Sequence, residues 1–239
     1  MNLDLPELTG DAVRDERAAW PVASTRVLGP GVISTFVADQ VQTPAGESMR
    51  RDYLSHPGAV VVIALDDADR VVVVRQYRHP VGFKLIEPPA GLLDLDNESW
   101  LVAAQRELAE EAMLAADDWR LLCDFFSSPG CLQESIRFFL ARGLRPAPRP
   151  DGFVVEHEEA DMDVTLVPLA DLVDAIYDGR VQSPSLTTGV LATHAALRDG
   201  RLDSLRRPDA PWPARDAKAA RDAEWARLRV AQDAGADQS

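Results

Sequence analysis

The sequence predicts an α+β fold, a sandwich in which helices pack on a mixed sheet, preceded by a small antiparallel N-terminal β-sheet. Three observations predict it. Residues 1–57 contain short alternating runs, such as that from Val32 to Ala38, which are typical of half-buried strands. Two continuous apolar runs rich in β-branched residues follow, Ala59 to Ala64 and Val71 to Val74, and these indicate central strands. Further along the chain, segments of strand and of helical composition alternate, which favours an α+β sandwich.

The elements follow in order along the chain. A polar connection of hairpin length, Asp66 to Arg70, joins the two central strands. The segment from Ser99 to Met113 has helical composition, with Asp96 or Asn97 available as its N-cap. We expect three later strands and two later helices, the strands at Trp119–Phe126, Ile136–Ala141 and Val164–Pro168 and the helices at Leu169–Asp178 and Pro184–Leu197.

Composition divides the chain into three regions. Residues 1–57 are β-rich, residues 58–200 hold the central elements, and residues 201–239 are rich in Arg, Asp, Ala and Pro. For the last region we expect a surface linker, a polar helix over Asp216 to Val230, and a disordered end.

Charge and hydrophobicity exclude several classes of protein. The net charge of −14 repels polyanions, so we expect no extended binding to nucleic acid. The longest apolar stretch, Gly58 to Leu65, is too short to cross a bilayer, and no signal or transit peptide is legible. We therefore expect a cytoplasmic protein that does not enter a membrane. Two cysteines, Cys123 and Cys131, form no disulfide framework, and we expect both to be buried.

The helix over residues 99–113 carries a group of carboxylates. At 100° per residue, Glu107, Glu110 and Glu111 share a face beside the apolar stripe. Like charges at this spacing repel each other unless a cation lies among them. Oxygen ligands favour Mg²⁺ or Mn²⁺, ions that commonly bridge to substrate phosphates. The alternative is a solvated acidic face in which Arg106 pairs with Glu110.

The residues around this helix resemble a known family motif. Gly91, Glu98, Arg106-Glu107-Leu108 and Glu110-Glu111 are similar to the Nudix box, which runs from a Gly through a Glu to Arg-Glu, Glu-Glu and a closing Gly. Here six residues instead of five separate Gly91 from Glu98, and Ala112 is taken as the residue in place of the closing Gly. Neither departure changes a carboxylate. The resemblance implies a Nudix α/β/α sandwich and a hydrolase.

Further passages resemble the ADP-ribose pyrophosphatase branch of this family, at His56–Gly58, Arg75–Pro80, Glu87–Asp94 and Ser127–Gly130. The resemblance implies Mg²⁺-dependent cleavage of ADP-ribose or a related nucleoside diphosphate sugar to AMP and a sugar phosphate, with Mn²⁺ as an alternative ion. It also implies a homodimer that exchanges the N-terminal sheet. Two other functions stay open: hydrolysis of nucleoside triphosphates in a house-cleaning role, and binding of ADP-ribose without cleavage.

The resemblance assigns roles to the residues of the box. It implies that Glu107, Glu111 and the carbonyl of Ala90 bind metal ions, with Glu110 contributing to a further ion. Arg106 is expected to orient these glutamates, and Glu98 to support the loop, so that Glu111 and Arg106 also count as catalytic residues.

Outside the box, the resemblance implies a catalytic base in the acidic loop Glu156–Asp161, with Glu158 preferred and Glu159 and Glu156 as alternatives. Substrate contacts are expected from Arg78 on the pyrophosphate and from Arg51 or Arg50 near the adenine. Two further glutamates are candidates: Glu134 to line the site, and Glu87 to contact a ribose or Arg106, or to form a structural salt bridge.

Overall fold

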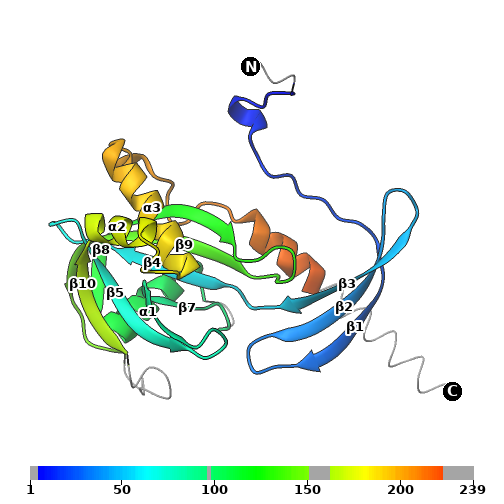
Figure 1. Ribbon diagram of the computed structural model, residues 1–239, viewed down its shortest axis with the longest axis horizontal. Helices are drawn as coiled ribbons and strands as arrows, with labels where there is room; N and C mark the ends of the chain where they lie inside the picture. The colour runs from blue at the N-terminus through cyan, green and yellow to red at the C-terminus, as the bar shows by residue number, and fades with distance from the viewer. Residues whose placement is uncertain (1–4, 96–97, 151–161, 223–239) are drawn as a thin grey trace.

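The structure is a computed structural model that describes residues 5–95, 98–150 and 162–222. Figure 1 shows a body of sheets and helices with a separate small sheet projecting from it. The elements are, in order, η1 (Gly10–Ala12), β1 (Val22–Pro30), β2 (Thr35–Gln42), β3 (Ser48–Ser55), β4 (Ala59–Ala64), β5 (Arg70–Arg78), β6 (Phe83–Glu87), β7 (Ala90–Leu92), α1 (Trp100–Ala112), β8 (Leu114–Phe126), β9 (Ser135–Pro146), β10 (Asp163–Pro168), α2 (Leu169–Tyr177), α3 (Pro184–Arg198) and η3 (Leu202–Ser204).

A four-stranded mixed sheet, in the order β7-β4-β9-β8, forms the centre of the body. Strand β4 pairs parallel with β9 and antiparallel with β7. Every residue of β4 is buried, which explains the uninterrupted apolar run in the sequence: both faces of the sheet are covered.

The two faces of β4 belong to two separate cores. Val60 and Val62 lie in a cluster with Leu108 of α1, whereas Val61 and Ile63 lie in a cluster with residues of α2 and α3. Successive strand residues point to opposite faces, so α1 covers one side and α2 and α3 the other (Figure 1). The predicted sandwich on a mixed sheet is confirmed.

Two antiparallel sheets complete the fold. One, in the order β10-β5-β6, extends the body, and the other, β1-β2-β3, is the N-terminal sheet that projects from it (Figure 1). In the projecting sheet, the buried Asp39 side chain accepts hydrogen bonds from the Thr25 hydroxyl (2.7 Å) and from the Tyr53 hydroxyl (2.9 Å). These bonds connect β1, β2 and β3 on one face, and the expected small antiparallel sheet is confirmed.

The structure corrects several predictions. The N-cap of α1 is Ser99, whose side chain accepts a hydrogen bond from the Val102 amide, and not Asp96 or Asn97. Cys131 is exposed and Cys123 partly buried, so the expected burial of Cys131 is wrong. The region after residue 200 is no simple surface linker, because Leu202 and Trp212 are buried in the two cores.

The helical expectation for residues 216–230 is met only in part. Residues 213–222 are helical, which begins earlier than predicted, and the rest of that range lies outside the described residues. No described helix is both long and apolar enough to span a bilayer.

Candidate active site

Helix α1 holds two buried carboxylates against the backbone of strand β7. Glu107 and Glu111 are buried, with only 9% and 7% of each residue exposed. The Ala90 amide donates a hydrogen bond to Glu111 Oε2 (3.1 Å). A Cβ atom placed on Gly91 would come within 1.9 Å of Glu107 Oε1. Gly91 is therefore required by close approach: the carboxylate occupies the space of a side chain at that position.

Arg106 binds three of the surrounding glutamates. Its Nε and Nη2 atoms donate to the two carboxylate oxygens of Glu98, each at 2.9 Å. Its Nη1 atom donates to Glu107 Oε1 (2.6 Å) and to Glu110 Oε2 (2.9 Å). The planar guanidinium suits such paired contacts, and it fixes the positions of α1 carboxylates relative to the loop that carries Glu98. This is the orienting contact that the resemblance implies, and it includes the pairing with Glu110 that the alternative reading proposed.

Burial determines the electrostatics of this cluster. Desolvation raises the pKa of Glu107 to about 7, with the Arg106 charge opposing the shift and Glu110 adding to it. The pKa of Arg106 is raised, first by its hydrogen bond with Glu98, so it stays charged. A buried carboxylate with a raised pKa is one whose ionisation a nearby cation would favour.

The donor set fits a hard divalent cation. Within the described residues, no three His, Cys, Asp or Glu side chains already converge as metal ligands, and Glu110 shares Arg106 with Glu107. Glu107 and Glu111, however, offer two buried carboxylates beside the backbone of β7. Oxygen donors of this kind suit Mg²⁺ and Mn²⁺.

A second polar chain contains two of the predicted substrate residues. Arg78 Nε donates to Glu87 Oε2 (2.8 Å), and the Ser183 hydroxyl donates to Glu87 Oε1 (3.3 Å). Glu87 is 8% exposed and Ser183 is fully buried, whereas the Arg78 side chain is 42% exposed. Glu87 therefore pairs with Arg78 and not with Arg106, and it anchors one edge of a guanidinium that is open to solvent.

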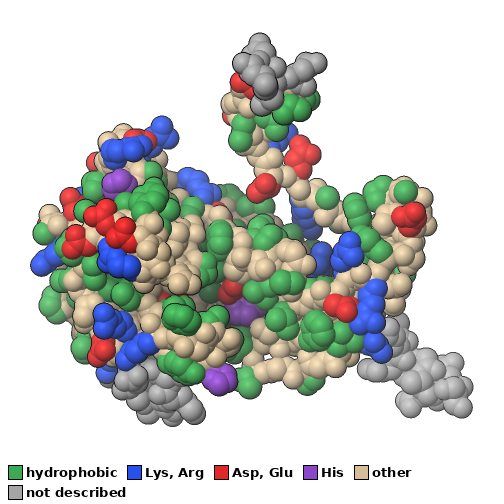
Figure 2. Space-filling view, viewed as in Figure 1, with side chains coloured by type: hydrophobic (Ala, Val, Ile, Leu, Met, Phe, Trp, Pro, Cys, Tyr) green, Lys and Arg blue, Asp and Glu red, His purple; other side chains and the backbone are tan. Residues whose placement is uncertain are grey.

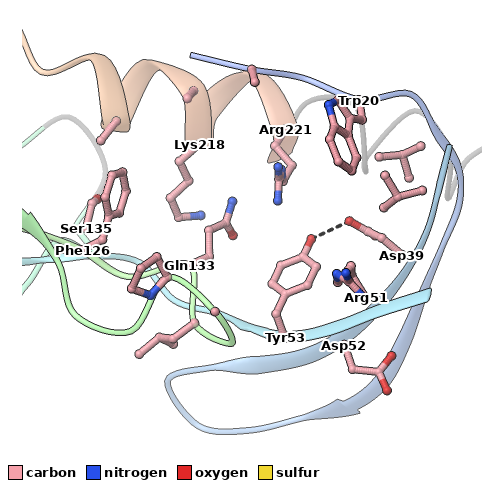
Figure 3. A pocket seen from close by; sticks show the side chains of 18 of the residues that line it. Trp20, Asp39, Arg51, Asp52, Tyr53, Phe126, Gln133, Ser135, Lys218 and Arg221 are labelled. Atoms are coloured by element: carbon pink, nitrogen blue, oxygen red, sulfur yellow. Dashed lines mark hydrogen bonds between the residues drawn. The ribbon is translucent and has the colours of Figure 1, made fainter. Parts of the chain in front are cut away.

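Arg51 lies elsewhere, in a cavity of about 460 Å³ between the N-terminal sheet and the body. Figure 3 shows Arg51 and Tyr53 rising from the sheet, Phe126 and Gln133 from the body, and Lys218 and Arg221 descending from the C-terminal helix. Burial raises the pKa of Tyr53, so its hydroxyl stays protonated and donates to Asp39. The cavity combines aromatic faces with cations. Arg50, the alternative to Arg51, instead pairs with Asp52 on the exposed surface.

The remaining predicted residues are not brought to the box. Glu134 Oε1 lies 3.5 Å from His56 Nδ1, which accepts a hydrogen bond from the Gly58 amide (3.1 Å). Burial lowers the pKa of His56, consistent with a neutral ring in a turn. Glu158, Glu159 and Glu156 lie outside the described residues.

Sequence reasoning missed several contributors to these groups. Nothing in the sequence indicated that Ser183 would bind Glu87, because a Ser before a Pro at a helix start indicates only an N-cap. Lys218 and Arg221 stood in a polar run that predicted only a solvated helix. Their place in the cavity follows from tertiary structure alone.

Comparisons with known proteins agree with this geometry. The NUDIX domain matches residues 55–187. The chain is 41% identical to an ADP-ribose pyrophosphatase of Mycobacterium tuberculosis over 172 residues, 72% of this chain and 82% of that protein. It is 32% identical to an ADP-ribose pyrophosphatase of Bacillus subtilis over 161 residues, 66% of this chain and 86% of that protein.

A solved structure, described as that of an ADP compounds hydrolase, superposes with a TM-score of 0.63 and covers 79% of this chain and all of that one. At 20% identity, that similarity concerns the fold alone. The domain match, the two relatives and the box residues on β7 and α1 lead to one conclusion: this chain belongs to the NUDIX family.

Proposed function

We propose that this protein hydrolyses the pyrophosphate bond of ADP-ribose, or of a related nucleoside diphosphate sugar, to AMP and a sugar phosphate. The observation that carries the proposal is the pair of buried carboxylates, Glu107 and Glu111, held against Ala90 and Gly91. The names of the relatives support the substrate class.

The proposed cofactor is Mg²⁺, with Mn²⁺ as an alternative. Glu107, Glu111 and the Ala90 carbonyl are its proposed ligands, with Glu110 contributing to a further ion. Such an ion, when bound, supplies charge neutralisation for the phosphates and activation of a water molecule. Arg106 acts on the ligands and not on the substrate, since all its described contacts are to Glu98, Glu107 and Glu110.

Arg78 is the proposed pyrophosphate contact. A guanidinium can bind two phosphate oxygens at once. Glu87 binds Nε and Nη2 of Arg78, and the Arg78 side chain is still partly exposed to solvent. Glu87 is then a positioning residue for Arg78, which is the salt-bridge alternative from the sequence.

Arg51 is the proposed contact to the adenine end. Its cavity offers Trp20, Tyr53 and Phe126 as aromatic faces, and a guanidinium stacks on a planar base as well. The base that takes a proton from the attacking water is proposed to be Glu158, with Glu159 and Glu156 as alternatives. Glu134 is proposed only to line the site, through its neighbours Gln133 and Ser135 in the cavity.

The proposed assembly is a homodimer formed through the N-terminal sheet. Four large apolar side chains on this sheet and its first turn are exposed by 40% or more: Val32, Ile33, Phe36 and Leu54. Figure 2 shows hydrophobic side chains at the surface of this projecting part. Apolar groups that gather on one surface mark interaction sites. The expected cytoplasmic location, and the expected lack of nucleic acid binding, stay predictions.

The test is product analysis after incubation with Mg²⁺ and a panel of ADP-ribose, ADP-glucose, NADH, diadenosine polyphosphates and nucleoside triphosphates. AMP and ribose 5-phosphate, formed fastest from ADP-ribose, support the proposal. Faster cleavage of triphosphates would make the protein a nucleoside triphosphate hydrolase. Tight binding of ADP-ribose without cleavage would make it a sensor.

A further inference from the structure

The segment over residues 206–222, here called the C-terminal clamp, is built into the body. Trp212 is 1% exposed and lies in the core that contains α1. The Leu121 amide of β8 donates a hydrogen bond to the Arg206 carbonyl (2.9 Å). Figure 1 shows the helix of this segment, in orange, between the body and the N-terminal sheet. A segment with a fully buried Trp has a fixed position, unlike a surface linker.

Trp212 contacts the first residue of α1. The rings of Trp212 and Trp100 meet edge to face, 5.3 Å between centroids and at 90°. The guanidinium of Arg137, a residue with 0% exposure, lies over both rings at 4.7 Å from Trp100 and 4.6 Å from Trp212. Edge-to-face aromatic pairs and cation–π contacts are both favourable, the latter more so when desolvated.

The Arg137 side chain also binds the backbone of the clamp. Its Nη1 atom donates to the Ala210 carbonyl (2.8 Å) and its Nη2 atom to the Pro211 carbonyl (3.1 Å), while Nε donates to Asp124 (2.8 Å). A buried charge is tolerated only when its donors are satisfied. Arg137, on strand β9, thus connects the clamp to the start of α1.

Arg215 makes the second contact, at the end of β7. It donates to the carbonyls of Pro57 and of Leu93, the latter at 3.4 Å. These residues flank strands that pair with each other, since Ala59 of β4 lies opposite Leu92 of β7. Arg215 therefore joins the entry to β4 and the exit from β7.

The two contacts lie at opposite ends of one connection. Strand β7 is followed by Leu93, whose carbonyl accepts a hydrogen bond from Arg215. Helix α1 begins at Trp100, whose ring contacts Trp212. Strand β7 carries Ala90, and α1 carries Glu107 and Glu111. Their mutual placement decides whether oxygen ligands lie at the distances that a divalent cation requires.

We propose that the C-terminal clamp positions the active site, with Arg215 and Trp212 as positioning residues that fix β7 relative to α1. The proposal rests on the proposed function for its catalytic readout, but its metal readout is independent of any substrate. Neither residue is proposed to touch the substrate, so their loss should weaken Mn²⁺ binding and lower kcat. Because Lys218 and Arg221 of the same segment line the Arg51 cavity, the KM for ADP-ribose can rise as well.

The experiment compares Arg215→Met and Arg215→Lys with the wild type, using Arg207→Met as the matched control. Arg207 lies in the same segment, is 81% exposed and pairs only with Asp209 among the described residues. Mn²⁺ affinity is measured by electron paramagnetic resonance without substrate, and kcat and KM are measured with ADP-ribose. We expect about tenfold weaker Mn²⁺ binding and about tenfold lower kcat in Arg215→Met. Arg215→Lys should be intermediate, because it keeps the charge and one donor nitrogen in place of two, and Arg207→Met should match the wild type.

Other outcomes would overturn the proposal. A lower melting temperature with unchanged Mn²⁺ affinity and kcat would leave the clamp a purely structural element. A higher KM with unchanged Mn²⁺ affinity and kcat would mean that the clamp shapes the Arg51 cavity and not the metal site. If Arg215→Met does not fold, Trp212→Phe provides the same comparison, since it keeps an aromatic contact with Trp100 and should weaken Mn²⁺ binding by a few-fold. A wild-type protein that binds Mn²⁺ but cleaves no ADP-ribose would contradict the proposed function, while the Mn²⁺ comparison would still decide on the clamp.

Discussion

Glu107 is a carboxylate that the fold buries beside the backbone of Gly91, and this burial disfavours its ionised form. Its pKa is raised from 4.5 to about 7, mainly by desolvation. Between these two values the folded chain binds more protons than the unfolded chain. The free energy of unfolding contributed by Glu107 is therefore largest below pH 4.5 and decreases as the pH rises towards 7.

This difference predicts a pH dependence that metal removal exposes. In EDTA, the melting temperature of the wild type should decrease more between pH 5 and pH 8 than that of Glu107→Gln, which cannot ionise. Mg²⁺ should recover the loss at pH 8 in the wild type only, because it binds the ionised folded form. Thermal denaturation with and without Mg²⁺ measures both effects, and Glu47→Gln, on the exposed turn between β2 and β3, serves as the control. An equal decrease in melting temperature between pH 5 and pH 8 in the wild type and in Glu107→Gln would contradict this account.

At the scale of the element, strand β7 lies so close to α1 that it leaves no room for a side chain at Gly91. In Gly91→Ala, the new Cβ would lie 1.9 Å from Glu107 Oε1 and 2.6 Å from its Cγ, so the Glu107 side chain must rotate away. We expect a folded protein with at least a tenfold loss of activity and of Mn²⁺ affinity. Circular dichroism and Mn²⁺ titration check this, with Gly29→Ala, where a Cβ meets nothing within 4 Å, as the control. Normal Mn²⁺ affinity in Gly91→Ala would exclude Glu107 as a ligand.

The C-terminal end of α1 corrects the sequence interpretation. The left-handed residue is Met113, with φ 54° and ψ 42°, and not Ala112, which stays helical. The position of the family's closing glycine is thus Met113. Because a side chain in this conformation costs about 1 kcal/mol, Met113→Gly should raise the free energy of unfolding by about 0.5–1 kcal/mol, less than the full cost because Gly is more flexible when unfolded. Urea denaturation measures it, and a decrease would show that Met113 contributes contacts worth more than its strain.

At the scale of the whole molecule, the projecting N-terminal sheet and its first turn leave Val32, Ile33 and Phe36 exposed among the residues that the structure describes. We expect the wild type to be a dimer and Ile33→Lys to shift it towards monomer, since a charge at this surface opposes apolar association. Light scattering coupled to size exclusion measures the mass. Tyr177→Lys is the control, because Tyr177 is 78% exposed at the end of α2. A wild type that is monomeric at micromolar concentration, or a dimer insensitive to Ile33→Lys, would contradict the proposed interface.

Much of this architecture could be predicted because it depends on local patterns. The run Ala59 to Ala64 is apolar on both faces and so predicted a central strand, and the periodicity of residues 99–113 predicted α1. The spacing of Glu107 and Glu111 predicted two carboxylates on one face, since that spacing is a property of the helix itself.

Features that depend on distant contacts were beyond such reasoning. Trp212 stands in a Pro-rich polar stretch that predicted a linker, and its burial depends on Arg137 and Trp100, which lie far away in sequence. The pairing of Glu87 with Arg78 instead of Arg106 likewise followed no local pattern, because Glu87 lies opposite Val74 and Arg78 opposite Phe83 in the ladder of β5 and β6. Long-range pairs of this kind are set by tertiary structure, and a single sequence does not encode them in any pattern.

The central claim is that the carboxylates on α1 hold the ion that makes this chain a hydrolase. The most direct measurement is the rate of AMP formation from ADP-ribose at saturating Mg²⁺ by the wild type and by Glu111→Gln, which keeps the shape of the side chain and an acceptor for the Ala90 amide. We predict a loss on the order of a hundredfold or more with unchanged circular dichroism and weaker Mn²⁺ binding. Wild-type rates with normal Mn²⁺ affinity in Glu111→Gln would contradict the account.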